Sequence, residues 1–407
     1  MKSSLLPGEL AGSNSGHAAS HNQAVILRTI RWSQPISRTE LARRSGLSKQ
    51  AVARITEKLL DDGLIIEARR RYGMRGQPAI ELEINPEGCF SVGIGLGRDH
   101  LTIVAVDALG TVRDRLHREV RYLLPDAFFA EVKEALKTFR RRHAIDENRL
   151  VGIGLAIPDL LGEIPFIGMP EAYSIWEETD IRACFAAFTE QPVFIDNDAT
   201  AAAIGELTYG LGVEIRSFFY IFIGAGLGGG IVLDGACYHG SSGISGEIGW
   251  LPLSPAGGRE GDGVQPLGQL VSLLQLYDFL ARHGIAVTQP QQLLGLDERG
   301  KDLVVIWLRM AARHLAEAAI DIGLLINPDA VLIGGRLPVT LMDKLLLFVH
   351  EELARDPRPM PPVYRAGGSE DAAALGAATM PLAHALRLEA ADPAQRTRSP
   401  LRARDLR

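Results

Sequence analysis

Residues 37–63 read SRTELARRSGLSKQAVARITEKLLDDG, and this stretch predicts two helices joined by a tight turn. Ser37 and Glu40 match the S-x-x-E capping box, in which a hydroxyl and a carboxylate satisfy backbone N–H groups at a helix start. We therefore expect a first helix over residues 38–45, with Gly46 as its C-terminal cap. The pattern is typical of a helix-turn-helix.

The second helix of this motif has an apolar face and a polar face. Its apolar residues recur at helical spacing and predict a buried stripe of Val52, Ile55, Leu59 and Leu60. Ser48 is placed to cap its first turn. Side chains that can donate to guanine or pair with adenine in a DNA major groove lie near its start. The predicted DNA-binding residues of this helix are Ser48, Lys49, Gln50 and Arg54.

A basic loop follows between two β-rich runs, LIIEA and AIELEI. The alternation of apolar and acidic residues in the second run predicts a hairpin, which would complete a winged helix-turn-helix. The loop RRRYGMRGQP, residues 69–78, carries arginines that could reach phosphates or a minor groove: Arg69, Arg70, Arg71 and Arg75. The alternative is a docking or dimerisation module in which this loop is only solvated surface.

The charge of the chain is divided unevenly along its length. The 407 residues, enough for two or three domains, carry a net charge of −6, made up of +5 over residues 1–85 and −11 over the remainder. This asymmetry predicts that only the N-terminal part meets a polyanion. Neither a membrane-spanning stretch nor an export signal is evident, so we expect a cytoplasmic protein. The three cysteines are widely spaced and predict buried thiols rather than disulfides.

The rest of the chain alternates short β-rich runs with helical stretches, which predicts an α/β fold. The segment GAGLGG, residues 224–229, contains G-x-G-x-x-G, but a second strand-like run, GGIVLDG, follows it directly instead of a helix. We therefore expect a glycine-rich hairpin whose backbone N–H groups can approach a phosphate or a sugar. The alternative is a tight hairpin without a ligand.

Three further segments carry a family resemblance: FIDNDATAAAIGE (194–206), GISGEIGW (243–250) and DAVLIGGRLP (329–338). Together with the N-terminal motifs, they resemble the ROK family (repressors, open reading frames, sugar kinases), and within it the NagC/XylR-type regulators. The resemblance spans residues from about 22 to 388. It implies a winged helix-turn-helix followed by a two-lobed, actin-like (ribonuclease-H-like) α/β body with a sugar between the lobes.

The resemblance also implies domain boundaries. We expect a disordered arm over 1–20, the winged helix-turn-helix over 21–85, a first lobe over 88–197 plus 370–388, a second lobe over 198–369, and a disordered basic tail over 389–407. The return of the last helix to the first lobe comes from the resemblance alone.

Ligand-binding residues are carried over by the same resemblance. Asn197 and Asp198 match the family's Asn-Asp pair, whose carboxylate is the general base in the kinases, so Asp198 holds a vestigial base position. Glu247 matches a sugar-contacting Glu. Asp198 also precedes an Ala-rich helix, and a helix N-cap is the alternative reading of that residue.

Two departures from the family pattern argue against catalysis and against zinc. The phosphate motif D-x-G-G-T is replaced by GLGRD, with Gly95 for Asp and Asp99 for Thr, so we expect no kinase activity and no bound ATP or magnesium. Trp250 replaces the zinc-binding His, and the Cys ligands are missing, so we expect no zinc. Trp250 could stack on a sugar or pack in the core.

These features predict a ligand-responsive transcription factor, a repressor of carbohydrate uptake or catabolism genes. Its expected partners are double-stranded operator DNA, a sugar or sugar derivative, and further copies of itself in a homodimer or homotetramer, with no membrane. The alternatives are an ATP-dependent sugar kinase with a DNA-binding head, and a DNA-bound protein whose body has lost ligand binding.

Overall fold

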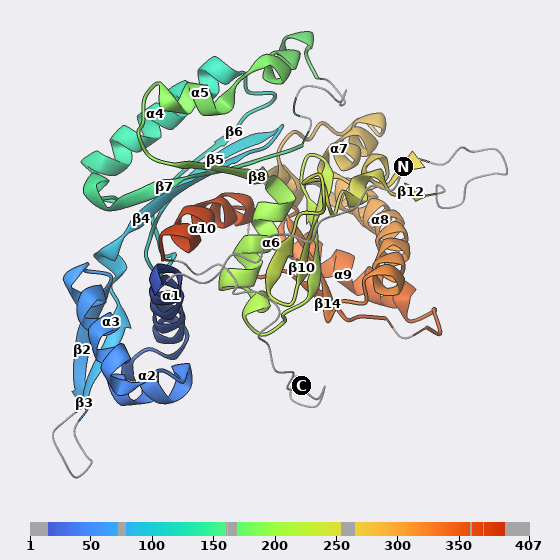
Figure 1. Ribbon diagram of the computed structural model, residues 1–407. Coiled ribbons are helices and arrows are strands. Elements are labelled where there is room, and N and C mark those ends of the chain that lie inside the picture. The colour runs from blue at the N-terminus through green and yellow to red at the C-terminus, as the bar shows by residue number, and fades with distance from the viewer. Residues whose placement is uncertain are drawn as a thin grey trace, which may run out of the picture. The chain divides into compact units, whose positions relative to one another are not determined.

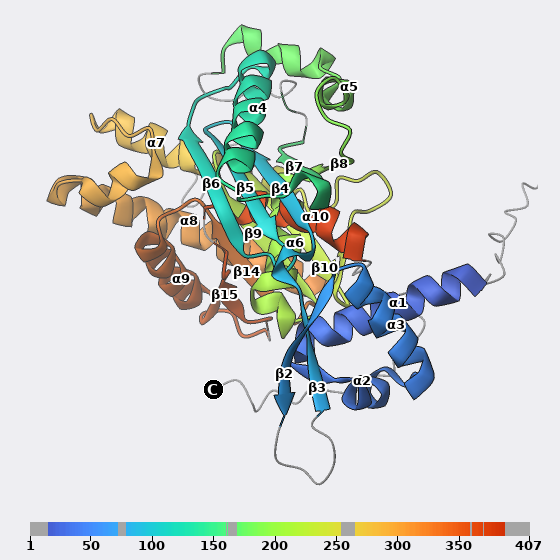
Figure 2. The ribbon, with the colours of Figure 1, turned by 90° about the vertical axis from the view of Figure 1, so that its left-hand side faces the viewer.

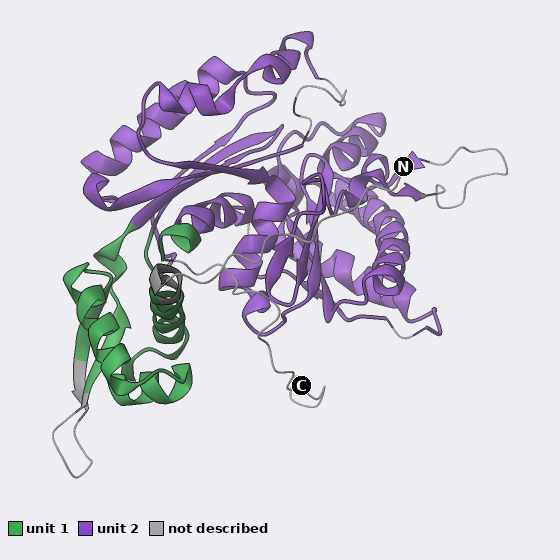
Figure 3. Cartoon of the chain, viewed as in Figure 1, with its two compact units in different colours: residues 1–89, 107–109, 382–388 green, residues 90–106, 110–381, 389–407 purple. Residues whose placement is uncertain are grey.

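The computed structural model describes residues 15–71, 79–159, 161, 169–253, 265–358, 360–368 and 370–386. The chain forms two compact units (Figure 3). The first, here called the head, comprises residues 1–89, 107–109 and 382–388, and the second, the body, comprises 90–106, 110–381 and 389–407. Within the described residues, no helix is long and apolar enough to cross a membrane.

The head is a winged helix-turn-helix, as the sequence predicted. Its helices are α1 (Ser15–Ser33), α2 (Arg38–Ser45) and α3 (Lys49–Asp61). Its antiparallel sheet has the order β1-β3-β2, built from β1 (Ile36–Ser37), β3 (Ala79–Ile84) and β2 (Ile65–Arg71) (Figure 2).

The expectation of a disordered arm over residues 1–20 is wrong from Ser15 onward, because α1 begins there. The apolar residues Ile26, Leu27 and Ile30 are buried on one side of α1. Packing of this stripe stabilises the helix. Residues 1–14 and the expected tail, 389–407, lie outside the described part of the chain.

The ends of α2 are fixed by local sequence. Ser37 accepts a hydrogen bond from the Glu40 backbone N–H at 3.3 Å, and Gly46 adopts a left-handed φ of 70°. Only one of the two hydrogen bonds of the predicted capping box forms, the one accepted by Ser37. The Glu40 carboxylate pairs instead with Arg43 at 2.5 Å and Arg44 at 2.7 Å, which are its neighbours on the next turn.

The buried stripe of α3 differs by one residue from the prediction. Val52, Ile55 and Leu59 are buried, but Leu60 is only half-buried and Thr56 is buried in the stripe. A polar residue is tolerated there because the Thr56 hydroxyl donates to the Ala53 carbonyl and accepts from the Arg38 guanidinium.

The body contains two five-stranded sheets. The first sheet has the order β6-β5-β4-β7-β8, with strands β4 (Phe90–Leu96), β5 (His100–Asp107), β6 (Val112–Glu119), β7 (Leu150–Ile157) and β8 (Val193–Asn197). Strand β7 is parallel to both β4 and β8. Helices α4 (Pro125–Arg141) and α5 (Ile181–Ala186) cover one face, where Phe128, Phe129 and Phe185 pack together (Figures 1 and 2).

The second sheet repeats this order. It runs β11-β10-β9-β14-β15, with strands β9 (Phe218–Ile223), β10 (Leu227–Leu233), β11 (Ala236–Tyr238), β14 (Ala330–Gly335) and β15 (Val363–Arg365). In each sheet the first strand is central, the next two strands follow on one side, and two later strands in parallel order follow on the other. The same chain path is therefore used twice.

Helices cover both faces of the second sheet. One face shares an apolar core with α7 (Leu273–Arg282), α8 (Glu298–Leu325) and α9 (Val339–Leu353). On the other side lie α6 (Asp198–Tyr209) and α10 (Ala372–Leu386), between the two sheets in Figure 1. A short ribbon of β12 (Pro252–Leu253) and β13 (Gln265–Pro266) completes the described strands.

Helix α10 packs closely on the first sheet through glycines. A Cβ added to Gly154 on β7 would lie 1.9 Å from the Ala377 carbonyl oxygen, and one added to Gly376 would lie 1.6 Å from the Ala201 carbonyl oxygen on α6. Larger side chains at these two positions would push the helix away. The boundary between two lobes at residue 198 stays a prediction.

The glycine-rich segment and the cysteines can now be placed. Strands β9 and β10 form an antiparallel hairpin, closed by a hydrogen bond from Gly224 N to Gly226 O at 2.9 Å, as the order of the sequence motifs predicted. All three cysteines are free thiols, but only Cys89 is fully buried, while Cys184 and Cys237 are half-buried.

Candidate functional site

The predicted DNA-binding residues of α3 lie together at its N-terminal end and are exposed: Ser48, Lys49, Gln50 and Arg54. The Ser48 hydroxyl already accepts a hydrogen bond from the Ala51 backbone N–H at 3.2 Å. The other three side chains project from a helix whose opposite face is buried in the head. This is the arrangement of a recognition helix.

The predicted wing is described only in part. Arg69, Arg70 and Arg71 belong to β2, and their backbones pair with residues 79–81 of β3. Arg75 lies outside the described residues, as do the side chains of the other three arginines. A phosphate-contacting role for this cluster stays a prediction.

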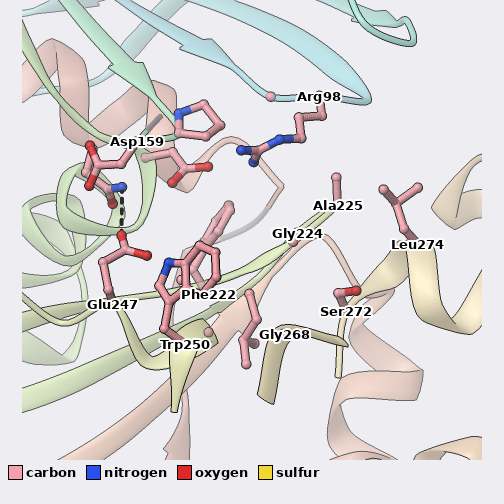
Figure 4. Close-up of a pocket in the computed structure, with 18 of the residues that line it drawn as sticks. Arg98, Asp159, Phe222, Gly224, Ala225, Glu247, Trp250, Gly268, Ser272 and Leu274 are labelled. Carbon is pink, nitrogen blue, oxygen red and sulfur yellow. Dashed lines mark hydrogen bonds between the residues drawn. The ribbon is translucent and has the colours of Figure 1, made fainter. Parts of the chain in front are cut away.

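The body holds a cavity of about 480 Å³ lined by residues from both of its sheets (Figure 4). From the first sheet come the turn between β4 and β5 and the segments that follow β7 and β8. From the second come the β9–β10 hairpin, residues 244–250 and the start of α7. The cavity brings together all four predicted ligand-binding residues: Asn197, Asp198, Glu247 and Trp250.

Asn197, not Asp198, caps helix α6. Its side-chain oxygen accepts hydrogen bonds from Ala199 N at 2.9 Å and Thr200 N at 3.1 Å, while its Nδ2 donates to Glu247 Oε1 at 3.4 Å. The N-cap position belongs to Asn197 because α6 begins at Asp198, one residue earlier than the alternative interpretation assumes. The Asp198 carboxylate nevertheless accepts a hydrogen bond from Ala199 N at 2.8 Å. The Asp198 carboxylate lines the cavity.

Three carboxyl groups at one end of the cavity shift each other's titration. Burial, followed by the negative charges of Asp159 and Asp198, raises the pKa of Glu247 to about 7. Burial also raises the pKa of Asp198, against the opposing effect of the Arg98 guanidinium, and it raises the pKa of Asp159. At neutral pH this end of the cavity can both donate and accept hydrogen bonds, as a polyhydroxylated ligand requires.

Asp159 was not predicted from the sequence. It follows strand β7, which is parallel to and paired with β8, the strand that ends at Asn197. Carboxyl ends of neighbouring parallel strands meet at one edge of a sheet, and ligand sites form there. The Asp in AIPD, residues 156–159, was the available signal.

The negative charge of Asp99 is balanced by a buried arginine. Its carboxylate forms an ion pair with Arg336 at 2.5 Å and a hydrogen bond with His100 at 2.8 Å. Arg336 also pairs with Glu119 at 2.5 Å, and Glu119 contacts His117 at 3.0 Å. Arg336 follows strand β14 of the second sheet, so one buried arginine ties the two sheets together.

Arg98 projects into the cavity beside this ion-pair network (Figure 4). It is 8% exposed, and burial lowers the pKa of its guanidinium, an effect that the carboxylate of Asp198 opposes. The cavity therefore contains this cationic side chain together with the carboxyl groups of Asp159, Asp198 and Glu247. Arg336 and the cavity role of Arg98 were not predicted, because the first of these depends on a contact 237 residues away in the chain.

Trp250 is 52% exposed and lines the cavity with Phe222, which rules out the reading of Trp250 as a buried core residue (Figure 4). The residues present do not fit the family's zinc site, since the cysteines lie at 89, 184 and 237 and none follows Trp250. Within the described part of the chain, no group of three or more His, Cys, Asp or Glu is placed to hold a metal ion.

Comparison with known proteins agrees with both units. Residues 91–384 match the ROK family, and residues 19–70 match the MarR family. The chain is 28% identical over 373 residues to the uncharacterized protein y4fQ of Sinorhizobium fredii, covering 88% of this chain and 90% of that protein. It is 28% identical over 232 residues to the xylose repressor of Bacillus spizizenii, covering 57% of this chain and 60% of the repressor.

A third relative and two solved structures extend the comparison. The transcriptional dual regulator NagC of Escherichia coli is 25% identical over 349 residues, covering 80% of this chain and 82% of NagC. A ROK family transcriptional regulator, a homologue of the E. coli MLC protein, aligns with a TM-score of 0.67 at 25% identity, covering 91% of this chain and 98% of that one. The ROK hexokinase of Thermus thermophilus aligns with a TM-score of 0.52 at 26% identity, covering 71% and 97%.

A winged helix-turn-helix with an exposed recognition helix, joined to an α/β body whose cavity contains carboxyl, amide and guanidinium groups, defines a DNA-binding transcription regulator that responds to a small ligand. The chain belongs to the ROK family, among its DNA-binding regulators.

Proposed function

We propose that the protein represses genes of carbohydrate uptake or catabolism and that a sugar or sugar derivative in the body cavity relieves or enforces this repression. The observation that carries the proposal is the pairing of two sites in one chain. The exposed end of α3 presents Lys49, Gln50 and Arg54 to DNA, and the cavity presents carboxyl, amide and guanidinium groups to a hydroxylated ligand. The repressor relatives named for xylose and N-acetylglucosamine support the ligand class.

The operator is expected to be a palindrome bound by a homodimer or homotetramer. Two recognition helices reach successive major grooves on one side of DNA when they lie roughly 34–36 Å apart, one helical turn. A two-fold axis between two heads produces this spacing. The sugar changes DNA affinity only to the extent that it binds the DNA-competent and DNA-incompetent arrangements unequally.

A genome-wide binding footprint of the purified protein on DNA of its own host tests the proposal. We expect discrete palindromic sites beside genes for sugar transport and catabolism, and these genes would nominate the ligand. The double variant Gln50→Ala/Arg54→Ala tests the role of α3. It should no longer bind these DNA sites, while the thermal unfolding transition of the body stays unchanged. Footprints that are unchanged in the variant would show that α3 does not read the operator.

A kinase is the second candidate, because the fold is shared with a ROK hexokinase and the Asp198 carboxylate lines the cavity. We infer that phosphoryl transfer is absent and that neither ATP, magnesium nor zinc is required. Gly95 leaves no carboxylate at the first position of the phosphate motif, and Asp99 is held by Arg336. ATP-dependent phosphorylation of any member of a hexose panel by the purified protein would overturn this inference.

A further inference from the structure

A second cavity, of about 490 Å³, lies directly beside the first. Pro158, Asp159 and Asn197 line both cavities, so the two are adjacent and share these residues. Each cavity alone lies in the range of roughly 300–1,000 Å³ that is usual for small-molecule sites. The sequence analysis did not predict this second cavity, although Asn197, one of the four predicted ligand residues, lines it.

The end of strand β8 divides its side chains between the two cavities. Asp196 lines the second cavity, Asp198 lines the first, and Asn197 between them lines both. The segment Ile195–Asp198 therefore offers three consecutive hydrogen-bonding side chains along one path that crosses from one cavity to the other. A ligand that followed this path would be longer than one sugar ring.

The second cavity has the lining expected for a sugar ring. His239 Nε2 lies 2.9 Å from Asp196 Oδ2, and this contact raises the pKa of His239. The same cavity is also lined by the apolar side chains of Ile181, Ile195 and Trp176. The Trp176 indole N–H donates to the Leu123 carbonyl oxygen at 2.9 Å. Polar edges beside an apolar surface suit the hydroxyls and the C–H face of a pyranose or furanose.

Asp159 lies between the two cavities and lines both. Its Oδ2 is buried and has no hydrogen-bond partner among the residues that the structure describes, although the carboxyl group as a whole interacts with Glu247 and Asn197. A buried carboxylate oxygen without a partner is costly unless a ligand or water donates to it. A hydroxyl of a ligand that spans the junction would supply that donor.

We propose that the ligand has two linked rings, as in a disaccharide or a glycoside. One ring binds Asn197, Asp198 and Glu247 in the first cavity, the second ring binds Asp196 and His239 in the second, and Asp159 accepts a hydrogen bond at the junction. This inference rests on the proposed function, because it assumes that the body binds a carbohydrate at all.

Matched pairs of sugars test the inference on the full-length protein. Thermal shift followed by isothermal titration would compare xylose with xylobiose, glucose with cellobiose and maltose, and N-acetylglucosamine with chitobiose. We expect at least one disaccharide to bind about tenfold or more tightly than its monosaccharide, the difference that one or two additional hydrogen bonds provide. A monosaccharide that binds as tightly as every disaccharide would overturn the inference.

Variants of the second cavity locate the additional contact. His239→Ala and Asp196→Asn should each weaken the disaccharide by about tenfold while the monosaccharide changes by less than about twofold. His283→Ala is the matched control, since His283 is an exposed histidine that lines neither cavity. Equal weakening of both sugars by His239→Ala would contradict a separate second-ring site. The absence of binding by any sugar of either size, with operator binding intact, would count against the proposed function itself.

Discussion

Glu247 is a cavity residue whose pKa lies well above its ordinary value. Its pKa of about 7 exceeds the ordinary 4.5, so the folded protein holds a proton that the unfolded chain has released. Protonated Glu247 therefore stabilises the fold fully below about pH 4.5, and this contribution is lost as the pH rises through about 7.

The expected result is that the melting temperature of the wild type falls between about pH 5 and pH 8 more steeply than that of Glu247→Gln, whose amide cannot ionise. Differential scanning calorimetry across this range checks the difference. Glu298→Gln, at an exposed position, is the control and should follow the wild type. Parallel curves for wild type and Glu247→Gln would show that the pKa of Glu247 is not raised by folding.

Trp250 offers an optical report on the cavity. The protein has four tryptophans, of which Trp176 and Trp307 are buried and Trp32 belongs to the head. We expect the sugar ligand to change the fluorescence of the wild type more than that of Trp250→Leu, which keeps Trp176 in the second cavity, and to bind this variant about fivefold to tenfold more weakly. Because the Trp250 side chain is 52% exposed, the stability of Trp250→Leu should differ little from that of the wild type. A full fluorescence response in Trp250→Leu would place the ligand away from this side chain.

At the scale of single elements, Ser48 has two roles that substitutions can distinguish: it caps helix α3, and it is predicted to contact DNA. Ser48→Ala removes the acceptor for the Ala51 N–H and should destabilise the head by about 1 kcal/mol. Ser48→Asp keeps a cap but brings a negative charge toward the DNA phosphates. If Ser48 contacts DNA as predicted, Ser48→Asp should unfold like the wild type and bind the operator much more weakly. Thermal unfolding and operator titration of both variants check this. Unimpaired operator binding by Ser48→Asp would show that Ser48 acts only as a helix cap.

The two sheets of the body are joined by the buried guanidinium of Arg336. Arg336→Gln leaves the carboxylates of Asp99 and Glu119 without their cation, and should cost about 3–5 kcal/mol of the free energy of unfolding. Arg336→Lys should recover only part of this, because an ammonium group does not match two carboxylates as a guanidinium does.

Urea denaturation measures these changes. Arg309→Gln is the matched control, because the ion pair of Arg309 with Glu351, at 3.1 Å, is exposed and should contribute less than about 1 kcal/mol. If Arg336→Gln and Arg309→Gln cost the same, the network between the sheets does not stabilise the body.

At the scale of the whole molecule, the sequence predicted what is decided locally. The bounds of α2 and the start of α3 follow from Ser37, Gly46 and Ser48, each of which acts within one helical turn. The α/β order and the glycine hairpin likewise follow from the succession of short segments. The resemblance to the ROK family added the ligand residues Asn197, Asp198 and Glu247, and the cavity brings these together.

The features that the sequence did not predict depend on residues far apart in the chain. Arg336 balances Asp99 across 237 positions, and Asp159 meets Asn197 only because β7 and β8 pair in parallel. The half-formed capping box has a nearer cause. The Glu40 carboxylate can reach either the backbone of Ser37 or the guanidinium groups on the next turn, and spacing alone does not decide between them.

The burial of Arg336 has a consequence for how the protein responds to salt. Dissolved ions screen exposed charges and hardly reach a guanidinium enclosed between two sheets. Operator binding through exposed Lys49 and Arg54 should fall steeply with added NaCl, by a factor of about 10³–10⁵ between 50 and 200 mM if six to ten phosphates are contacted. Sugar affinity, measured by titration over the same range, should change less than about twofold. A rise in ionic strength would then release the regulator from DNA while the sugar affinity of the free protein stays nearly the same.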